Sequence, residues 1–145
     1  MHLYLLRHGE AEPFARDDTS RSLTSTGKAS VASKARFIGK VDVMVVSPYL
    51  RALQSADALV EEGLSVQRRL VDDRVTPDCA LDPIIEDVIQ PGLSSQLIVA
   101  HNPLLTQLVR LLCGEQANNI ALGTGDLACL SGDFLPGCAH LEWLR

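Results

Sequence analysis

The chain has 145 residues, of which 46% are hydrophobic and 21% charged, and its formal net charge at pH 7 is −5. This length fits one domain, residues 1–145, that can bury a core without disulfides or metal. The negative charge argues against nucleic acid as a partner, because binding a phosphate backbone requires clustered basic residues. No apolar run approaches the ~20 residues of a membrane helix and no signal-like stretch opens the chain, so we expect a cytoplasmic protein that contacts no membrane.

Four cysteines are scattered along the chain, at Cys79, Cys113, Cys129 and Cys138. None of them forms a Cys-x-x-Cys pair, which makes a zinc or redox site a weak interpretation. Their scatter is typical of buried thiols in a reducing compartment, and a disulfide is the less favoured alternative.

The chain opens with a strand, a polar loop and a helix. The apolar run Leu3–Leu6 predicts a buried strand that ends at Arg7-His8-Gly9-Glu10. A polar loop follows over residues 11–23. Thr24 can then cap a helix that runs from Ser25 toward Ile38.

A second strand and a second helix come next. Val41–Val46 predicts the strand, and Ser47-Pro48 supplies an N-cap followed by proline at the first helical position. The helix is expected to run to about Glu62. Val66–Val71 predicts a further short strand.

The second half of the chain repeats the alternation of strands and helices. Asp82-Pro83 is typical of a helix start, and Leu97–Ala100 predicts a buried strand. Asn102-Pro103 again combines a cap with a proline at the start of a helix. Leu127–Leu130 and His140–Leu144 predict two final strands.

This order of elements predicts an α/β fold, a three-layer α/β/α sandwich whose sheet is mostly parallel with an antiparallel C-terminal edge. In such sheets, functional sites form beyond the carboxyl ends of the strands. Arg7 and His8 follow the first strand, Arg51 lies in the first turn after the second strand, and His101 follows the strand over 97–100. We therefore expect these four side chains to meet at one rim.

Two arginines and two histidines together suit a phosphate group. The planar, permanently charged guanidinium matches phosphate oxygens. The expected helix N-termini at Pro48 and Pro103 add positive dipole ends. Histidine is a nucleophile when neutral and stabilises negative charge when protonated, so two histidines in one pocket can take different roles.

Three segments resemble the histidine phosphatase superfamily. Arg7-His8-Gly9-Glu10 resembles its Arg-His-Gly signature, and Ser47-Pro48-Tyr49-Leu50-Arg51-Ala52 with Gln54-Ser55 resembles its second-arginine motif. Val99-Ala100-His101 is similar to the segment with its second histidine. The phosphoglycerate mutases of the superfamily carry larger helical insertions before that histidine, so this compact chain is most similar to the SixA-like phosphohistidine phosphatases. Two further segments look like that subgroup: Arg21–Gly27 and Val75-Thr76-Pro77.

The resemblance implies a phosphoglycerate mutase-like fold and a metal-independent phosphatase without a cofactor. Neutral His8 would attack phosphorus and become phosphohistidine, while Arg7, Arg51 and protonated His101 hold the three equatorial oxygens. Water would then hydrolyse the intermediate. Arg21 is a further candidate for contact with phosphate.

The resemblance also implies the substrate, a phosphohistidine on a phosphorylated protein such as a histidine phosphotransfer domain. Two alternatives stay open from the sequence. The chain could be a phosphatase for a small phosphorylated metabolite, or a phosphate-binding module without turnover.

The group that protonates the leaving group is the least defined part of the site. The SixA-like pattern leads us to expect a glutamate just before the Val75-Thr76-Pro77 segment, where this chain has Arg74. Asp72, Asp73 and Glu10 are the candidate acids, although Asp72 and Asp73 also fit solvated turn residues. Without an acid, alkyl phosphates should react slowly, whereas a phosphoramidate should be less affected. Gly123-Thr124-Gly125 is interpreted as a turn, because no Lys-Ser/Thr follows it.

Overall fold

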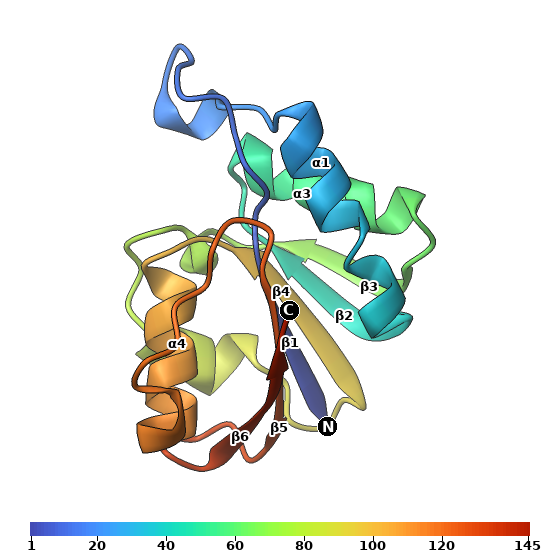
Figure 1. Ribbon diagram of the computed structural model, residues 1–145. Coiled ribbons are helices and arrows are strands. Elements are labelled where there is room, and N and C mark those ends of the chain that lie inside the picture. Colours follow the sequence, from blue (N-terminus) through green and yellow to red (C-terminus); the bar gives the residue numbers. More distant parts are fainter.

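The computed structural model describes residues 1–145 and shows one six-stranded sheet with helices on both faces (Figure 1). The strands are β1 (His2–Arg7), β2 (Lys40–Val46), β3 (Ser65–Val71), β4 (Ser95–Ala100), β5 (Leu127–Gly132) and β6 (Ala139–Leu144). Their order across the sheet is β3-β2-β4-β1-β5-β6. The strands β1 to β4 pair in parallel, whereas β5 and β6 pair antiparallel at one edge. The predicted mostly parallel sheet with an antiparallel C-terminal edge is confirmed.

Four helices cover the sheet. They are α1 (Ser25–Ala32), α2 (Ala35–Ile38), α3 (Leu50–Glu61) and α4 (Leu104–Cys113). Short helical segments join them: η1 (Asp18–Ser20), η2 (Asp73–Val75), η4 (Gly114–Ala117) and the single π-helical turn η3 (Ile84–Val88). The helices α1, α2 and α3 pack on one face, and α4 and η3 pack on the other (Figure 1).

Alternate residues of the central strands face the two layers of core. Leu5 of β1 and Ile98 of β4 belong to the cluster with α4, and their chain neighbours Leu6 and Val99 belong to the cluster with α1 and α3. All four side chains are fully buried. A strand buried on both faces has no polar side to show, which explains why these strands appear in the sequence as continuous apolar runs.

The predicted helix over residues 25–38 is divided in the structure. Thr24 caps its start as expected, since its hydroxyl accepts a hydrogen bond from Gly27 N at 3.0 Å. The chain then turns at residues 33–34. The Ser33 hydroxyl donates to the carbonyl of Ser30 at 2.6 Å, a local bond that competes with the helical pattern.

Two helix starts predicted from Ser-Pro and Asn-Pro are displaced. The helix α3 begins at Leu50 instead of Pro48, because Ser47 N still bonds to Val99 O at 3.0 Å and so continues the sheet. The helix α4 begins at Leu104. Its N-cap position is Pro103, which has no side-chain cap, but Asn102 Oδ1 accepts from Thr106 N in the first turn at 3.1 Å. The helix expected after Asp82-Pro83 is only the single turn η3.

The structure also tests what the sequence predicts about the cysteines and about membrane-spanning helices. All four cysteines are free thiols, so the disulfide alternative is wrong for this structure. Cys113 and Cys129 are buried as expected, whereas Cys138 is exposed. No helix is both long and apolar enough to cross a bilayer.

Candidate active site

His8 lies directly beyond β1 and is buried, with 6% of its surface exposed. Its N–H donates to the carbonyl of Ala100 at 3.0 Å, so the end of β4 holds its backbone. Its ring Nδ1 lies 2.8 Å from the carbonyl of Gly9. A carbonyl can only accept, so Nδ1 carries the proton and Nε2 presents a lone pair. The local fold therefore selects the tautomer that a histidine nucleophile needs.

Gly9 is fixed by close contact with two other elements. A Cβ added at Gly9 would lie 2.5 Å from the carbonyl oxygen of Gly27 in α1, too near for any side chain. Gly9 N donates to the hydroxyl of Ser55 at 3.0 Å, and this hydroxyl donates to the carbonyl of Arg51 at 2.7 Å. The glycine after His8 thus lets α1 and α3 pack directly against the end of β1.

Arg51 projects from the first turn of α3 and is also buried, with 5% of its side chain exposed. Its Nε donates to His8 Nε2 at 3.2 Å. Its two outer nitrogens reach Asp18: Nη1 donates to the backbone carbonyl at 2.7 Å and Nη2 to carboxylate Oδ2 at 3.2 Å. The guanidinium also lies 4.9 Å from the centre of the Tyr49 ring. One arginine therefore contacts both the unprotonated nitrogen of His8 and an exposed carboxylate.

His101 follows β4 and is 1% exposed. Its ring centre lies 5.0 Å from that of His8. Its Nε2 is 2.6 Å from the Ser47 hydroxyl, which also accepts from Tyr49 N at 3.3 Å. A hydroxyl that accepts from Tyr49 can also donate to Nε2, and in that arrangement the imidazole proton lies on Nδ1. His101 Nδ1 is buried without a partner in the protein, so it can donate to a group that enters the pocket.

Arg7 completes the set at the last position of β1. Its Nη1 donates to the carbonyl of Leu122 at 2.9 Å, and its buried Nε has no partner in the protein. Gly125 N lies 3.0 Å from the carbonyl of Arg7 and 2.9 Å from that of His8. The segment 123–125 is therefore a turn that supports Arg7 and His8, and its interpretation as a turn is confirmed.

Burial keeps both pocket histidines neutral at neutral pH. Burial lowers the pKa of His8 to about 4, and the charges of Arg51 and Arg7 act in the same direction. Burial likewise lowers the pKa of His101 to about 3, with further lowering by His8 and Arg51. Protonated His101, expected from the resemblance, is thus not the form that this pocket favours by itself. A phosphoryl dianion beside the ring would act in the opposite direction and favour the imidazolium.

The three candidate acids are not brought together with these groups. The Glu10 carboxylate accepts from the Thr24 hydroxyl at 2.9 Å, at the start of α1. Asp72 binds Arg74, with Oδ2 2.7 Å from Nη2, and this bond lowers the pKa of Asp72. Asp73 is exposed and is the first residue of η2. None of the three forms a hydrogen bond with the two histidines or Arg51, and their assignment as proton donors remains a prediction without support from contacts.

Arg21 reaches the pocket through Asp18. Its Nη1 lies 3.0 Å from Asp18 Oδ1, and its Nε donates to the carbonyl of Glu12 at 2.8 Å. Its charge also contributes to the lowered pKa of His8, after burial and the other two arginines. No motif pointed to Asp18 in the sequence. The only signal was an acidic residue three positions before Arg21, which is common in loops.

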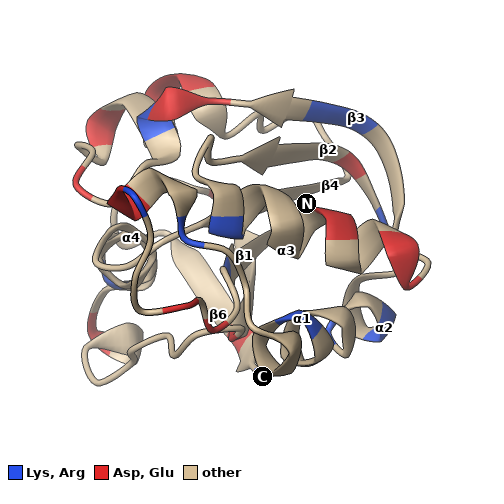
Figure 2. Cartoon of the chain, turned by 90° about the horizontal axis from the view of Figure 1, so that it is seen from above, with Lys and Arg blue, Asp and Glu red and all other residues tan.

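The charges are unevenly distributed at this end of the sheet. Figure 2 looks down on the molecule and shows a basic segment at the start of α3 and acidic segments beyond the end of β3. No group of three or more His, Cys, Asp or Glu side chains comes together as a metal site would require. The positive charge of the pocket is that of its arginines.

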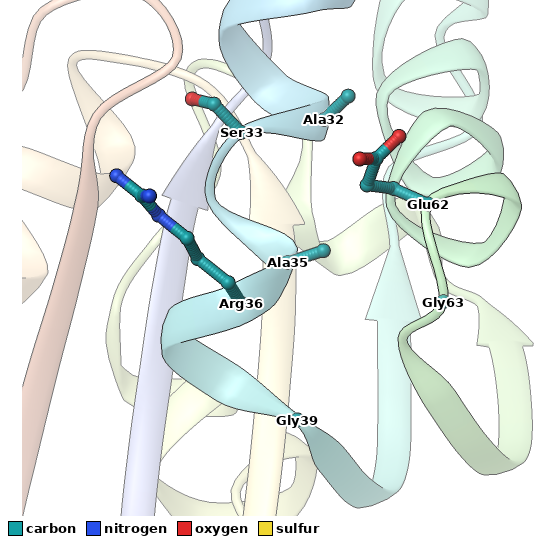
Figure 3. A pocket seen from close by; sticks show the side chains of 7 residues that line it. All are labelled: Ala32, Ser33, Ala35, Arg36, Gly39, Glu62 and Gly63. Carbon is teal, nitrogen blue, oxygen red and sulfur yellow. The ribbon is translucent and has the colours of Figure 1, made fainter.

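A separate hollow of about 460 Å³ opens at the amino ends of β2 and β3 (Figure 3). Its lining includes one acidic and one basic residue, Glu62 and Arg36, and no histidine or cysteine; the Arg36 side chain points away from Glu62 (Figure 3). The hollow lies at the other end of the parallel strands from His8 and His101. It is lined by Ala32, Ser33, Ala35, Arg36, Gly39, Glu62 and Gly63.

The arrangement around His8 is suited to phosphoryl transfer. A nucleophilic nitrogen lies beside one guanidinium, a second guanidinium has a free buried N–H, and a neutral imidazole offers another donor. In-line transfer of a phosphoryl group requires a nucleophile and fixed donors for the equatorial oxygens, and little else.

Comparisons with known proteins agree with this chemistry. The family model described as the histidine phosphatase superfamily (branch 1) matches residues 3–72. The phosphohistidine phosphatase SixA homolog of Haemophilus influenzae is 29% identical over 92% of this chain and 89% of its own length. The phosphohistidine phosphatase SixA of Escherichia coli is 30% identical over 78% of this chain and 74% of its own length. A solved structure of the protein histidine phosphatase SixA complexed with tungstate superposes with a TM-score of 0.89, at 24% identity, over 100% of this chain and 96% of that one.

Proposed function

The chain belongs to the histidine phosphatase superfamily, and from this premise we propose that it is a phosphohistidine phosphatase that acts on a phosphorylated protein. The observation that supports the proposal is the 3.2 Å contact between Arg51 Nε and His8 Nε2, the ring nitrogen that carries no proton when Nδ1 donates to Gly9. The proposed substrate follows from the SixA relatives, whose names specify phosphohistidine.

The first step would transfer the phosphoryl group to His8. Arg51 and Arg7 bind its oxygens, and Nδ1 of His101 donates a further hydrogen bond. His8 Nε2 then attacks phosphorus in line with the leaving nitrogen, so that one P–N bond forms as the other breaks. The leaving imidazole keeps the bonding electron pair and takes up a proton from solvent.

The second step would restore the enzyme. Water attacks the phosphohistidine at His8, the P–N bond breaks toward Nε2, and inorganic phosphate leaves. The hydrogen bond from His8 Nδ1 to Gly9 holds the ring in one orientation through both steps. The same arginines serve both transfers, because the equatorial oxygens occupy similar places in each transition state.

Rapid-quench labelling with a radioactive phosphoryl donor tests this proposal. We expect one phosphoryl group per chain, labile in acid and stable in base, on His8. The variant His8→Gln should carry no label, and His140→Gln, an exposed histidine outside the site, should label normally. A label that survives in His8→Gln would refute the assignment of the nucleophile. Phosphate that binds without any label or turnover would instead favour a binding module.

A matched substrate panel separates protein from metabolite substrates. We expect a phosphorylated histidine phosphotransfer domain to give a higher kcat/KM than small phosphorylated metabolites under the same conditions. Metabolites that equal or exceed the phosphoprotein would make the metabolite phosphatase the better interpretation.

A further inference from the structure

The loop between β1 and α1 forms a defined arm over the pocket, residues 12–22, which stands out from the molecule in Figure 1. Ala11 and Leu23 pair at its base, and Glu12 N donates to the carbonyl of Ser22 at 2.8 Å. Gln54 of α3 accepts from Leu23 N at 2.6 Å. The arm is therefore anchored at its base, while every residue from Glu12 to Ser20 is exposed.

Asp18 is the point where this arm enters the active site. Its backbone carbonyl and its carboxylate take the two outer nitrogens of Arg51, at 2.7 and 3.2 Å. Its other carboxylate oxygen binds Arg21 at 3.0 Å. The Asp18 side chain is 59% exposed, whereas that of Arg51 is 5% exposed. A buried cation is thus paired with an anion that is largely exposed to solvent.

Two features show that Asp18 presents a charge to the pocket. Its bonds to Arg21 and then to Arg51 lower the pKa of its carboxyl, so it is ionised at neutral pH. Its charge is also felt at His101: burial dominates there and lowers the pKa, but Asp18 acts in the opposite direction. A phosphoryl dianion would be bound by the same Arg51 beside the same imidazole, and two anions on one guanidinium repel each other.

We propose that the Asp18 carboxylate competes with phosphate for Arg51. This competition lowers the affinity of the pocket for phosphate and so favours release of the product. This inference rests on the proposed function, because it takes the pocket to be a phosphate site. A phosphorylated protein makes contacts beyond the phosphoryl group and can offset this competition, whereas free phosphate cannot. Asp18 would thereby lower the affinity of the pocket for the product more than for the substrate, although both bind Arg51.

The arm supplies a matched control for the test. Asp17 is the adjacent residue and carries the same charge, but it accepts hydrogen bonds only from within the arm, from the hydroxyls of Thr19 and Ser20. The variants Asp18→Asn and Asp17→Asn each remove one charge and keep a side chain of the same shape. Only Asp18→Asn removes the anion from Arg51.

Titration calorimetry with inorganic phosphate distinguishes the outcomes. We expect Asp18→Asn to bind phosphate about two- to fivefold more tightly than the wild type, the fold-change that corresponds to the upper part of the range for an exposed ion pair. The inhibition constant of phosphate should fall by the same factor, and Asp17→Asn should match the wild type.

Three other results would overturn the inference. Equal or weaker phosphate binding by Asp18→Asn would mean that Asp18 only positions Arg51. A loss of kcat in Asp18→Asn that grows with the basicity of the leaving group would make Asp18 a proton donor. If neither the wild type nor the variants bind phosphate, the proposed function fails together with this inference.

Discussion

The two parts of the pocket differ in burial. Its floor, formed by His8, Arg51 and His101, is buried, whereas the arm above it, residues 12–22, is mostly exposed. On the floor, His8, Arg51 and His101 are each exposed by 6% or less and are held by strand ends and by Gly9, Ser47 and Ser55. On the arm, Asp18 is held by Arg21 and Arg51, and Arg21 is held by Asp18 and the carbonyl of Glu12. From this comparison we expect a division of roles: the buried groups would fix the geometry of the reaction, and Asp18 on the arm would adjust the affinity of the pocket for phosphate.

The sharpest test of this division compares one substitution in each region. We expect His8→Ala to lose at least about 10³-fold in rate, the scale expected for removal of a nucleophile. On the arm, Phe14→Ser should leave hydrolysis of an aryl phosphate within about twofold, because Phe14 is 88% exposed and a surface substitution of this kind has little effect. Steady-state assays of both variants check the prediction. Near-normal activity in His8→Ala would refute the role of the floor.

The leaving group gives the next largest expected effect. No carboxyl group forms a hydrogen bond with His8 or His101 in the structure; Asp18 is ionised and binds Arg51, and Glu10 accepts from Thr24. A general acid typically contributes about 10²- to 10⁴-fold, and its absence matters most for a poor leaving group. We therefore expect phosphohistidine and aryl phosphates to react at least about 10²-fold faster than alkyl phosphates.

A panel of phosphohistidine peptide, aryl phosphate, sugar phosphate and phosphoserine peptide measures this difference. Equal rates for sugar phosphate and phosphohistidine would show that an acid is present. Asp72→Asn, Asp73→Asn, Glu10→Gln and Asp18→Asn would then identify it.

The sequence was sufficient for the floor and insufficient for the arm, for a physical reason. Buried strands appear as apolar runs, and parallel strands bring their carboxyl ends to one edge, so the meeting of Arg7, His8 and His101 follows from order alone. The sequence predicts Ser47 as a helix cap, whereas in the structure its hydroxyl forms a hydrogen bond with His101. That contact joins the ends of two strands that are distant in the sequence, so no local sequence pattern predicts it.

The contacts of the arm could not be predicted in this way, because they do not follow a periodic pattern of residue types in the sequence. The contact of Asp18 with Arg51 links a polar loop to a helix 33 positions away. Acidic residues in loops are usually solvated, and Asp18 is mostly solvated too. The three candidate acids, Glu10, Asp72 and Asp73, lie near the motifs in the sequence. In the structure, however, Asp18 is the acid that binds Arg51.

Acid should destabilise the floor before it affects the arm. The folded-state pKa values of His8 and His101, about 4 and about 3, lie below the ordinary value of 6.5. The unfolded chain therefore binds more protons than the folded one below pH ~6.5, so stability falls as the pH falls through this value. Each histidine should remove about 1 kcal/mol of unfolding free energy between pH 7.5 and pH 5.5.

Urea unfolding at the two pH values measures this loss. The variant His8→Gln should lose about half of the pH dependence, while His140→Gln, an exposed histidine, should keep all of it. An unchanged pH dependence in His8→Gln would show that His8 is not held neutral on the floor.

The smallest expected effect is that of removing metal ions. It tests whether the floor supplies all the positive charge that the reaction needs. Arg7 and Arg51 cannot lose their protons at neutral pH, and a bound dianion favours protonation of His101. No cluster of three or more potential metal ligands lies nearby. Exhaustive chelation should therefore change kcat/KM by less than about twofold, while vanadate or tungstate should inhibit by occupying the arginine site. A loss of activity on chelation that one divalent ion restores would contradict this mechanism. In that case the two arginines would be insufficient, and the ion would have to act on the phosphoryl group itself.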